Sequence, residues 1–244
     1  QAPPAEAVHK APHPFPPGTR NPVPVTMNPE PRTFNLDKSL KITMLTAYDY
    51  SFARLVDQAG IDVILVGDSA SNVMAGFETT LPITLDNMIY HAASVVRGTN
   101  RALVVVDLPF GTYQGNSKEA LASAIRIMKE TGAQAIKLEG GVRVVPQIKA
   151  IVEAGILVMG HIGLTPQSSG QLGGHKAQGR TLETARIVIE DALAVQDAGA
   201  QMILLEAIPP EVAAYITKEL STPVLSIGAG PDCDGHLLIV SDMI

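Results

Sequence analysis

The sequence predicts an α/β protein with the (β/α)8 TIM-barrel fold. From residue 41 onward, eight short apolar runs alternate with stretches of helical pattern. Apolar residues within each run are mostly adjacent rather than alternating, which is typical of parallel strands covered on both faces. A doubly wound open sheet is the alternative, but no G-x-G-x-x-G follows the first strand and the count of strands reaches that of a barrel.

The predicted strands recur at the spacing of a repeated strand–helix unit. They are residues 41–49, 62–69, 102–109, 135–141, 157–163, 202–209, 224–230 and 237–244. The eighth run reaches the last residue of the sequence, and no helix pattern follows it. We therefore expect a barrel that is apparently truncated after strand eight.

The segment between the third and fourth strands carries helix signals at both of its ends. Ser117 is suited to the N-cap, and Glu119 lies in the first turn, where a negative charge is favourable. Gly132 is a plausible stop, because glycine readily adopts the left-handed conformation that ends many helices. The pattern predicts one amphipathic helix here.

The segment between the fifth and sixth strands shows the same signals. Thr181 is the expected N-cap, Glu183 lies in the first turn, and Gly199 is the expected stop. Apolar residues at helical spacing predict which side of this helix is buried. That predicted face consists of Ile187, Val188, Ala192 and Val195.

Residues 1–34 differ from the rest of the chain. Ten of the 18 prolines lie before residue 32, and no apolar periodicity is present. Such a segment buries too little surface to offset its ordering entropy, so we expect it to be extended or disordered. Residues 35–244 are expected to form a single barrel domain that lacks its C-terminal helix or helices.

The overall composition limits the partners and the compartment. A net charge of -6 and a pI of about 5.5 argue against nucleic acid and anionic membranes as partners, and no apolar run is long enough to span a bilayer. The lone cysteine, Cys233, lies in a Gly/Asp-rich stretch and is interpreted as an incidental loop thiol. We expect a cytoplasmic protein, or a mitochondrial one if residues 1–34 are the remnant of a targeting peptide.

Polar and ionisable residues stand where five of the predicted strands end. They are Asp68, Ser69, Asp107, Lys137, Glu139, His161 and Glu206. Any one of them could be an ordinary polar strand end that faces water. Together they predict an active site, because a barrel places the carboxyl ends of its strands on the rim where active sites of this fold are built.

The three carboxylates predict a divalent cation. Asp68, Asp107 and Glu139 would repel one another at close range unless they were protonated or neutralised by a cation. Their hard oxygens favour Mg²⁺ over Mn²⁺ or Ca²⁺, and the sequence has no Cys/His set with zinc spacing. Ser69 could donate to an anion beside the metal or could simply cap the following turn.

Each of the remaining residues on the rim has more than one possible role. Lys137 precedes Glu139 by two residues, which places both side chains on the same face of a strand, toward the barrel interior. Lys137 is a candidate anion partner, with a Schiff base as a less needed role. His161 is a substrate-binding group or a packed, hydrogen-bonded histidine. Glu206 is a candidate general base or a carboxylate at a helix N-terminus.

Two segments are too long for plain turns between strand and helix. They are residues 69–83, after the second strand, and residues 164–180, after the fifth. Long loops at this end of a barrel are often lids over the site. A metal beside a general base suits an α-keto acid, whose enolate the metal would stabilise for attack on an electrophilic carbon.

Several motifs resemble those of the ketopantoate hydroxymethyltransferase (3-methyl-2-oxobutanoate hydroxymethyltransferase) family. The resemblance runs from about Ile42 to the C-terminus. The motifs are TAYDYSFA (46–53), LVGDS (65–69), TLPIT (80–84), DLPF (107–110), KLEGG (137–141), GHIGLTPQ (160–167), GGHKAQGR (173–180), LLEAIP (204–209) and IGAG (227–230). Their order along most of the chain makes the resemblance specific.

The resemblance implies a barrel enzyme of pantothenate synthesis. It would transfer a hydroxymethyl group from 5,10-methylenetetrahydrofolate to 3-methyl-2-oxobutanoate and form 2-dehydropantoate. Asp68 and Asp107 match Mg²⁺ ligands of the family that also contact the substrate, and Glu139 matches a third acid of the metal site. The family also forms decamers, which implies a homo-oligomer for a chain with a complete C-terminus.

The resemblance also assigns the residues that would handle the keto acid. Ser69 and Lys137 match keto-acid binding residues, His161 matches a histidine on the substrate side, and Glu206 matches the proposed base. Two alternatives stay open. One is a metal-dependent lyase that cleaves carbon–carbon bonds of keto acids, and the other is an inactive, truncated chain.

Overall fold

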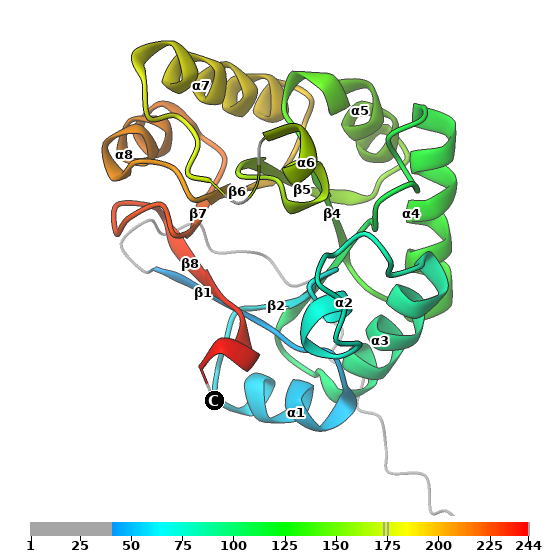
Figure 1. Ribbon diagram of the computed structural model, residues 1–244. Helices are drawn as coiled ribbons and strands as arrows, with labels where there is room; N and C mark the ends of the chain where they lie inside the picture. Colours follow the sequence, from blue (N-terminus) through cyan, green and yellow to red (C-terminus); the bar gives the residue numbers. More distant parts are fainter. Residues whose placement is uncertain (1–40, 173, 175, 244) are drawn as a thin grey trace, which may run out of the picture. The chain divides into compact units, whose positions relative to one another are not determined.

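The computed structural model describes residues 41–172, 174 and 176–243, and within them the chain forms a closed barrel of eight parallel strands (Figure 1). The predicted (β/α)8 class is confirmed. The strands are β1 (Ile42–Thr46), β2 (Val63–Val66), β3 (Leu103–Asp107), β4 (Ala135–Glu139), β5 (Leu157–Gly163), β6 (Met202–Glu206), β7 (Val224–Ile227) and β8 (Gly235–Leu238). Strand β8 pairs with β1 and so closes the barrel. The predicted N-terminal segment, residues 1–34, lies outside the described residues.

Helices surround the strands on the outside of the barrel (Figure 1). They are α1 (Tyr50–Gln58), α3 (Leu85–Gly98), α4 (Ser117–Thr131), α5 (Val145–Glu153), α7 (Leu182–Asp197) and α8 (Pro210–Glu219). Shorter elements lie in the loops: α2 (Ala70–Val73), α6 (Ser169–Leu172), η1 (Val142–Val144), η2 (Pro166–Ser168) and η3 (Val240–Asp242). No helix among the described residues is long and apolar enough to cross a membrane.

The C-terminal part of the barrel differs from the prediction. Strand β8 covers Gly235–Leu238 rather than residues 237–244, because Gly235 and His236 already pair with β7 on one side and with β1 on the other. The chain then turns into η3. Residues 228–234 join β7 to β8 directly, so strands and helices do not alternate there. This connection is too short to hold a helix of the usual length.

The helix ends confirm most of the predicted caps. Helix α4 has Asn116 rather than Ser117 as its N-cap, since the Asn116 side chain accepts hydrogen bonds from the N–H groups of Lys118 and Glu119. Gly132 ends α4 in the left-handed conformation at φ 77°. Helix α7 begins at the predicted N-cap, Thr181, whose hydroxyl accepts from the N–H of Thr184 in a capping box.

The apolar residues form two layers that are separated by the strands. Alternate strand residues such as Ile136, Leu138, Ile162 and Leu205 pack against the helices in one continuous core, to which Cys233 also belongs. The intervening residues of the same strands point into the barrel. Of the predicted face of α7, Val188, Ala192 and Val195 are buried, whereas Ile187 is 52% exposed.

Close packing between α7 and the barrel depends on a glycine. A Cβ atom at Gly160 of β5 would lie 2.3 Å from the Val195 side chain. Any larger residue at this position would push α7 away from β5. Gly160 precedes His161, so this close contact also holds the strand that carries a predicted site residue.

Candidate active site

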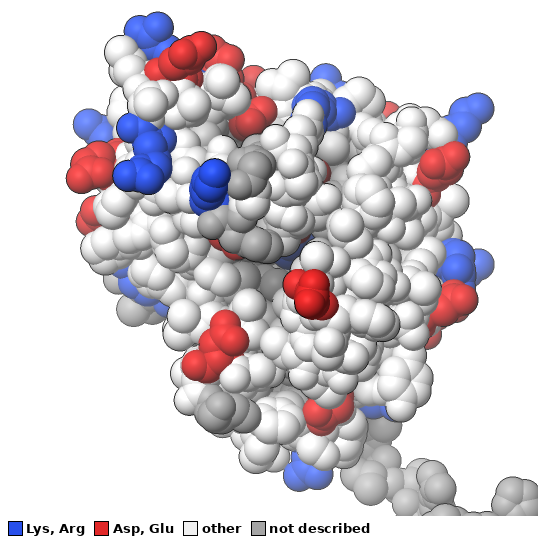
Figure 2. Space-filling model, in the orientation of Figure 1, with Lys and Arg blue, Asp and Glu red and all other residues white. Residues whose placement is uncertain are grey.

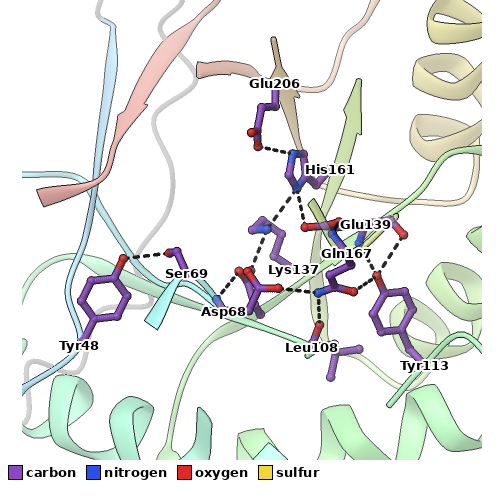
Figure 3. A network of polar contacts seen from close by, with 11 residues as sticks. Tyr48, Asp68, Ser69, Leu108, Tyr113, Lys137, Glu139, His161, Gln167 and Glu206 are labelled. Carbon is purple, nitrogen blue, oxygen red and sulfur yellow. Dashed lines mark hydrogen bonds and ion pairs between the residues drawn. The ribbon is translucent and has the colours of Figure 1, made fainter. Parts of the chain in front are cut away.

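The seven predicted site residues line one cavity of about 180 Å³ at the carboxyl ends of the strands. They are Asp68, Ser69, Asp107, Lys137, Glu139, His161 and Glu206. Figure 3 shows six of these side chains by label, converging from β4, β5 and β6 and from the loop after β2. The face drawn in Figure 2 is hollowed near its centre and carries acidic and basic side chains interspersed over a largely uncharged surface.

Lys137 is the cation of this cluster. Its Nζ lies 2.9 Å from Oδ1 of Asp107, and both side chains are almost fully buried. The backbone N–H of Asp68 donates to the other carboxylate oxygen of Asp107 at 2.9 Å. Burial alone would lower the pKa of Lys137, but Asp107, Glu139 and Asp68 outweigh it and hold that pKa above its usual value. Lys137 is therefore a fixed ammonium among carboxylates and not a free amine.

Asp68 is a buried acid whose charge is incompletely compensated. Burial, together with the neighbouring charges of Asp107 and Glu139, raises the pKa of Asp68 to about 7. Lys137 and a hydrogen bond from Gln167 oppose this shift but do not cancel it. A second cation next to Asp68 would therefore be favourable.

His161 connects two glutamates. Its Nδ1 lies 3.4 Å from Oε1 of Glu139, and its Nε2 lies 3.0 Å from Oε2 of Glu206. Burial and the charge of Lys137 would lower the pKa of His161, but the two glutamates raise it to about 9. Burial likewise opposes ionisation of Glu139, yet His161 and Lys137 hold the pKa of Glu139 below its usual value. The two glutamates favour an imidazolium next to a carboxylate at neutral pH, and the ammonium of Lys137, whose Nζ lies 3.3 Å from Nδ1 of His161, opposes it.

The backbone around Glu206 is tightly constrained. A Cβ atom at Gly163, the last residue of β5, would lie 2.4 Å from the carbonyl oxygen of Glu206, so only glycine permits this approach. Ala207 follows with φ 48°, the one positive φ among the non-glycine residues that the structure describes. Such conformations cost energy and often occur at functional sites. Glu206 is partly exposed, with 21% of its side chain accessible, at the mouth of the cavity.

Ser69 is oriented by a tyrosine. The Ser69 Oγ lies 2.9 Å from the hydroxyl of the buried Tyr48, and the two share a hydrogen bond. Ser69 also lies at the start of α2 but makes no side-chain capping bond there. The Ser69 hydroxyl thus lines the cavity and does not cap the helix.

Three further residues reach the cluster or its cavity and were not singled out from the strand ends. Gln167 and Tyr113 join the carboxylates through hydrogen bonds, as Figure 3 shows. Thr80 lines the cavity, and its Oγ1 is buried without a hydrogen-bond partner among the described residues. Thr80 and Gln167 lie in the motifs TLPIT and GHIGLTPQ, and these motifs could have indicated both residues.

Both long loops lie against cavities. In residues 69–83, the hydroxyl of Ser71 donates to the carbonyl of Thr79, and Asn72 and Thr80 line the smaller cavity. In the described part of residues 164–180, Pro166 lines the same cavity. A second cavity of about 410 Å³ lies between that loop and α7, lined in part by Arg143, Gln178 and Asp191.

The donor set fits a hard divalent cation. Asp68 and Asp107 supply carboxylate oxygens. Burial first, and then the charges of Asp107 and Glu139, raise the pKa of Asp68, so a cation beside it would stabilise its ionised form. As arranged here, the described residues contain no group of three or more His, Cys, Asp or Glu side chains spaced to hold a metal ion. Both oxygens of Glu139 already meet protein donors, from His161 and from the backbone of Gln167, and those of Asp107 meet Lys137 and the backbone N–H of Asp68. Asp68, whose Oδ1 has no partner among the described residues, is therefore the first candidate ligand. Asp107 would join it by exchanging a protein donor for the cation, with Glu139 acting through water.

The whole barrel region matches one family. A model of the family described as ketopantoate hydroxymethyltransferase matches residues 32–244. The chain belongs to the ketopantoate hydroxymethyltransferase family. The 3-methyl-2-oxobutanoate hydroxymethyltransferase of Parabacteroides distasonis is 62% identical over 204 residues, which are 84% of this chain and 75% of that protein. The enzyme of the same name from Cytophaga hutchinsonii is 58% identical over the same shares. As a family member, the protein is an enzyme of the transferase class.

Solved structures show that this ketopantoate hydroxymethyltransferase family member shares its fold with other barrel enzymes. A phosphoenolpyruvate phosphomutase from Streptomyces platensis subsp. rosaceus superposes with a TM-score of 0.64 at 17% identity, covering 83% of this chain and 77% of the other. A phosphonopyruvate hydrolase in complex with oxalate and Mg²⁺ gives a TM-score of 0.63 at 15% identity, with coverage of 83% and 76%. At these identities the likeness concerns the fold alone.

Replacing Asp68 with Asn is expected to stabilise the metal-free protein at neutral and alkaline pH. Because the folded-state pKa of Asp68 is raised from 3.8 to about 7, the contribution of Asp68 to wild-type stability falls as pH rises from 4 through 7. The neutral Asn removes this loss, so its free energy of unfolding at pH 8 should exceed that of wild type by about 2 to 4 kcal/mol. Urea unfolding in EDTA at pH 5 and pH 8 measures the difference, and an equal gain at both pH values would contradict it.

Proposed function

We propose that the protein transfers a hydroxymethyl group from 5,10-methylenetetrahydrofolate to 3-methyl-2-oxobutanoate in a Mg²⁺-dependent reaction that forms 2-dehydropantoate. One observation carries this proposal. A small buried cavity combines a fixed ammonium, a pair of carboxylates suited to a cation and a carboxylate at its mouth, in a chain whose relatives are named for this reaction. The cavity volume suits a keto acid of a few carbon atoms.

The interior residues would bind the keto acid as an anion. Lys137 supplies a permanent positive charge, and Ser69, oriented by Tyr48, supplies a hydroxyl donor at the cavity wall. Asp68 and Asp107 would hold Mg²⁺. When bound, that ion supplies positive charge beside the carboxylate and keto oxygens and so stabilises the enolate.

Proton removal is assigned to Glu206. Its carboxylate takes the proton from C3 of 3-methyl-2-oxobutanoate, and the electron pair left on C3 forms the bond to the methylene carbon of the folate. Cleavage of that carbon's two bonds to nitrogen releases tetrahydrofolate, and a water supplies the hydroxyl group of the product. The two protons that the nitrogens gain come from this water and from C3 by way of Glu206. His161, 3.0 Å from Glu206, would hold the carboxylate in place and is itself protonated at neutral pH.

Exchange of the C3 proton for deuterium tests this proposal directly. With Mg²⁺ present and folate absent, the protein should accelerate exchange into 3-methyl-2-oxobutanoate, followed by proton NMR in deuterium oxide. No acceleration over the protein-free reaction, or equal acceleration by Asp68→Asn, would refute the mechanism. Carbon–carbon cleavage of a substituted keto acid or malate without folate would instead favour the lyase alternative.

The larger cavity is the place proposed for the folate. At about 410 Å³ it exceeds the keto-acid cavity, and it lies beside the same strand ends, between η1 and α7. Arg143 lines it and donates to the side chain of Gln171, and Asp191 lines it and accepts a hydrogen bond from the backbone of Val142. A guanidinium suits the glutamate tail of a folate, and a carboxylate suits the donor edge of its pterin ring.

Arg143→Ala should raise the KM for 5,10-methylenetetrahydrofolate about 10-fold or more, since a charge-assisted hydrogen bond is lost. The KM for 3-methyl-2-oxobutanoate and the C3 exchange rate should stay within about two-fold, because the smaller cavity is untouched. Steady-state kinetics with each substrate varied in turn gives the comparison. Arg186→Ala, on the same side of the barrel but outside the cavity lining, is the matched control. An equal rise in both KM values would contradict the assignment.

We also propose a cytoplasmic homo-oligomer. The relatives compared above come from bacteria, which gives the mitochondrial alternative no support. The oligomeric proposal rests on the decamers of the family. Light scattering of the purified protein tests it, and a monomer at micromolar concentration would contradict it.

A further inference from the structure

The Gln167 side chain lies at the centre of the hydrogen bonds that support the acid cluster (Figure 3). It is only 6% exposed and follows β5 in η2, outside the set of strand-end residues. Its Nε2 donates to Oδ2 of Asp68 at 2.8 Å and to the carbonyl of Leu108 at 3.0 Å. Its backbone N–H donates to Oε2 of Glu139 at 3.0 Å. One residue therefore contacts two of the three carboxylates.

The orientation of this amide is fixed from the other end. The hydroxyl of Tyr113 donates to Oε1 of Gln167 at 2.7 Å, and Nε2 of Gln114 donates to the same oxygen at 3.0 Å. The Gln114 amide is itself oriented, because its Oε1 accepts from the backbone N–H of Gly111 at 2.8 Å. A flipped Gln167 amide would set donor against donor at one end and acceptor against acceptor at the other.

The hydrogen bonds of the Tyr113 hydroxyl show which of its partners receives its proton. It accepts a hydrogen bond from the backbone N–H of Glu139 at 3.1 Å, so its single proton is available to an acceptor. Of the two acceptors in reach, Oε1 of Gln167 at 2.7 Å is closer than the carbonyl of Glu139 at 3.2 Å. Tyr113 is 1% exposed, and burial raises the pKa of its hydroxyl well above the usual value. It is a permanent donor to Gln167.

The consequence falls on Asp68. With Oδ2 held by Gln167, its other oxygen, Oδ1, makes no hydrogen bond or ion pair within the described residues, and Asp68 lines the cavity. Glu139 is held in the same way, with Oε2 on the backbone of Gln167 and Oε1 beside His161. The arrangement fixes one oxygen of Asp68 and leaves the other to a ligand.

We propose that Gln167 is a positioning residue that directs Oδ1 of Asp68 toward a cation in the cavity, and that Tyr113 acts through Gln167 by fixing its amide. This inference rests on the proposed Mg²⁺ site. Partners that orient metal ligands commonly contribute 10- to 100-fold to metal affinity. If Gln167 only filled space, a side chain of the same size without hydrogen-bonding groups would leave the cation affinity unchanged.

The experiment measures Mn²⁺ binding by electron paramagnetic resonance, together with thermal unfolding. Gln167→Met keeps the size of the side chain and removes both the donor and the acceptor of its amide, while the backbone N–H that donates to Glu139 remains. It should therefore weaken Mn²⁺ binding about 10- to 100-fold. The deuterium exchange rate should then recover at saturating Mg²⁺. Gln58→Met, the same change on the exposed end of α1, should bind Mn²⁺ as wild type does. Unchanged binding by Gln167→Met, or an exchange rate that saturating Mg²⁺ does not restore, overturns the proposal.

A double-mutant cycle separates Tyr113 from a general effect on stability. Tyr113→Phe should weaken Mn²⁺ binding by a smaller factor in the wild-type background and should have almost no further effect in Gln167→Met. Additive effects would mean that Tyr113 does not act through Gln167. Wild-type protein that binds no Mn²⁺ would overturn the cation site itself, whereas wild-type binding with an unaffected Gln167→Met variant overturns only the positioning role.

Discussion

Replacing Lys137 with Met is expected to destabilise the metal-free protein by about 3 to 5 kcal/mol, the usual cost of removing one partner of a buried ion pair. The ammonium lies 2.9 Å from Asp107, and both side chains are buried. It also offsets the charges of Asp68 and Glu139. These two carboxylates and Asp107 all raise the pKa of Lys137. Without it, carboxylates would remain buried together with too little positive charge.

Mg²⁺ should reverse part of this loss. A divalent cation held by Asp68 and Asp107 replaces the missing charge and binds only the folded site, so it stabilises the variant by mass action. Urea unfolding at pH 7.5, in EDTA and in excess Mg²⁺, measures both effects. Lys149→Met, an exposed lysine on α5, is the control and should change stability by less than about 0.5 kcal/mol. A Lys137→Met protein as stable as wild type in EDTA would contradict the prediction.

The variant should also be catalytically poor even when folded. Lys137 lines the cavity and is the candidate partner of the keto-acid carboxylate. Mg²⁺ can restore stability without restoring this contact, because an ion on Asp68 and Asp107 does not occupy the position of the Lys137 ammonium. Recovery of folding without recovery of substrate binding would separate the two contributions of one side chain.

The fold could be predicted from sequence because its main signals are local. Adjacent apolar residues mark strands that are covered on both faces, and the spacing of two between Lys137 and Glu139 places them together inside the barrel, where both are found. The bounds of β8 could not be predicted in this way. Gly235 belongs to the strand because of its pairing with β1 and β7, which is distant in sequence and invisible to a local pattern.

In the candidate site, the residues at strand ends could be predicted from sequence, whereas a residue from a loop could not. Residues at strand ends share one rim whatever the details of packing, so the seven expected side chains meet in one cavity. Gln167 comes from a loop, and its position depends on where the chain after β5 folds back over β3 and β4. Ile187 is a related case, because a helical face predicts burial only where another element covers it, and here the larger cavity lies beside it.

Replacing Glu206 with Gln is expected to slow C3 proton exchange by about 10²- to 10⁴-fold, the usual contribution of a general base. Glutamine is close in size and retains an oxygen that can face Nε2 of His161, so the cavity should keep its shape. Mn²⁺ binding should stay within about three-fold of wild type, since Glu206 contacts His161 and is not one of the candidate metal ligands. Proton NMR in deuterium oxide gives the exchange rate.

The competing base is His161, and pH distinguishes the two. Because Glu139 and Glu206 raise the pKa of His161 to about 9, its imidazole is protonated near neutral pH and cannot accept a proton there. Exchange by His161 would therefore rise with pH up to about 9, whereas exchange by Glu206 requires no such rise. The exposed Glu211→Gln on α8 controls for the loss of one negative charge. A Glu206→Gln enzyme that keeps wild-type exchange, with a rate that climbs with pH to a midpoint below that of wild type because one of the two glutamates that raise the pKa of His161 is gone, would assign the base to His161 and leave Glu206 as the group that holds the ring.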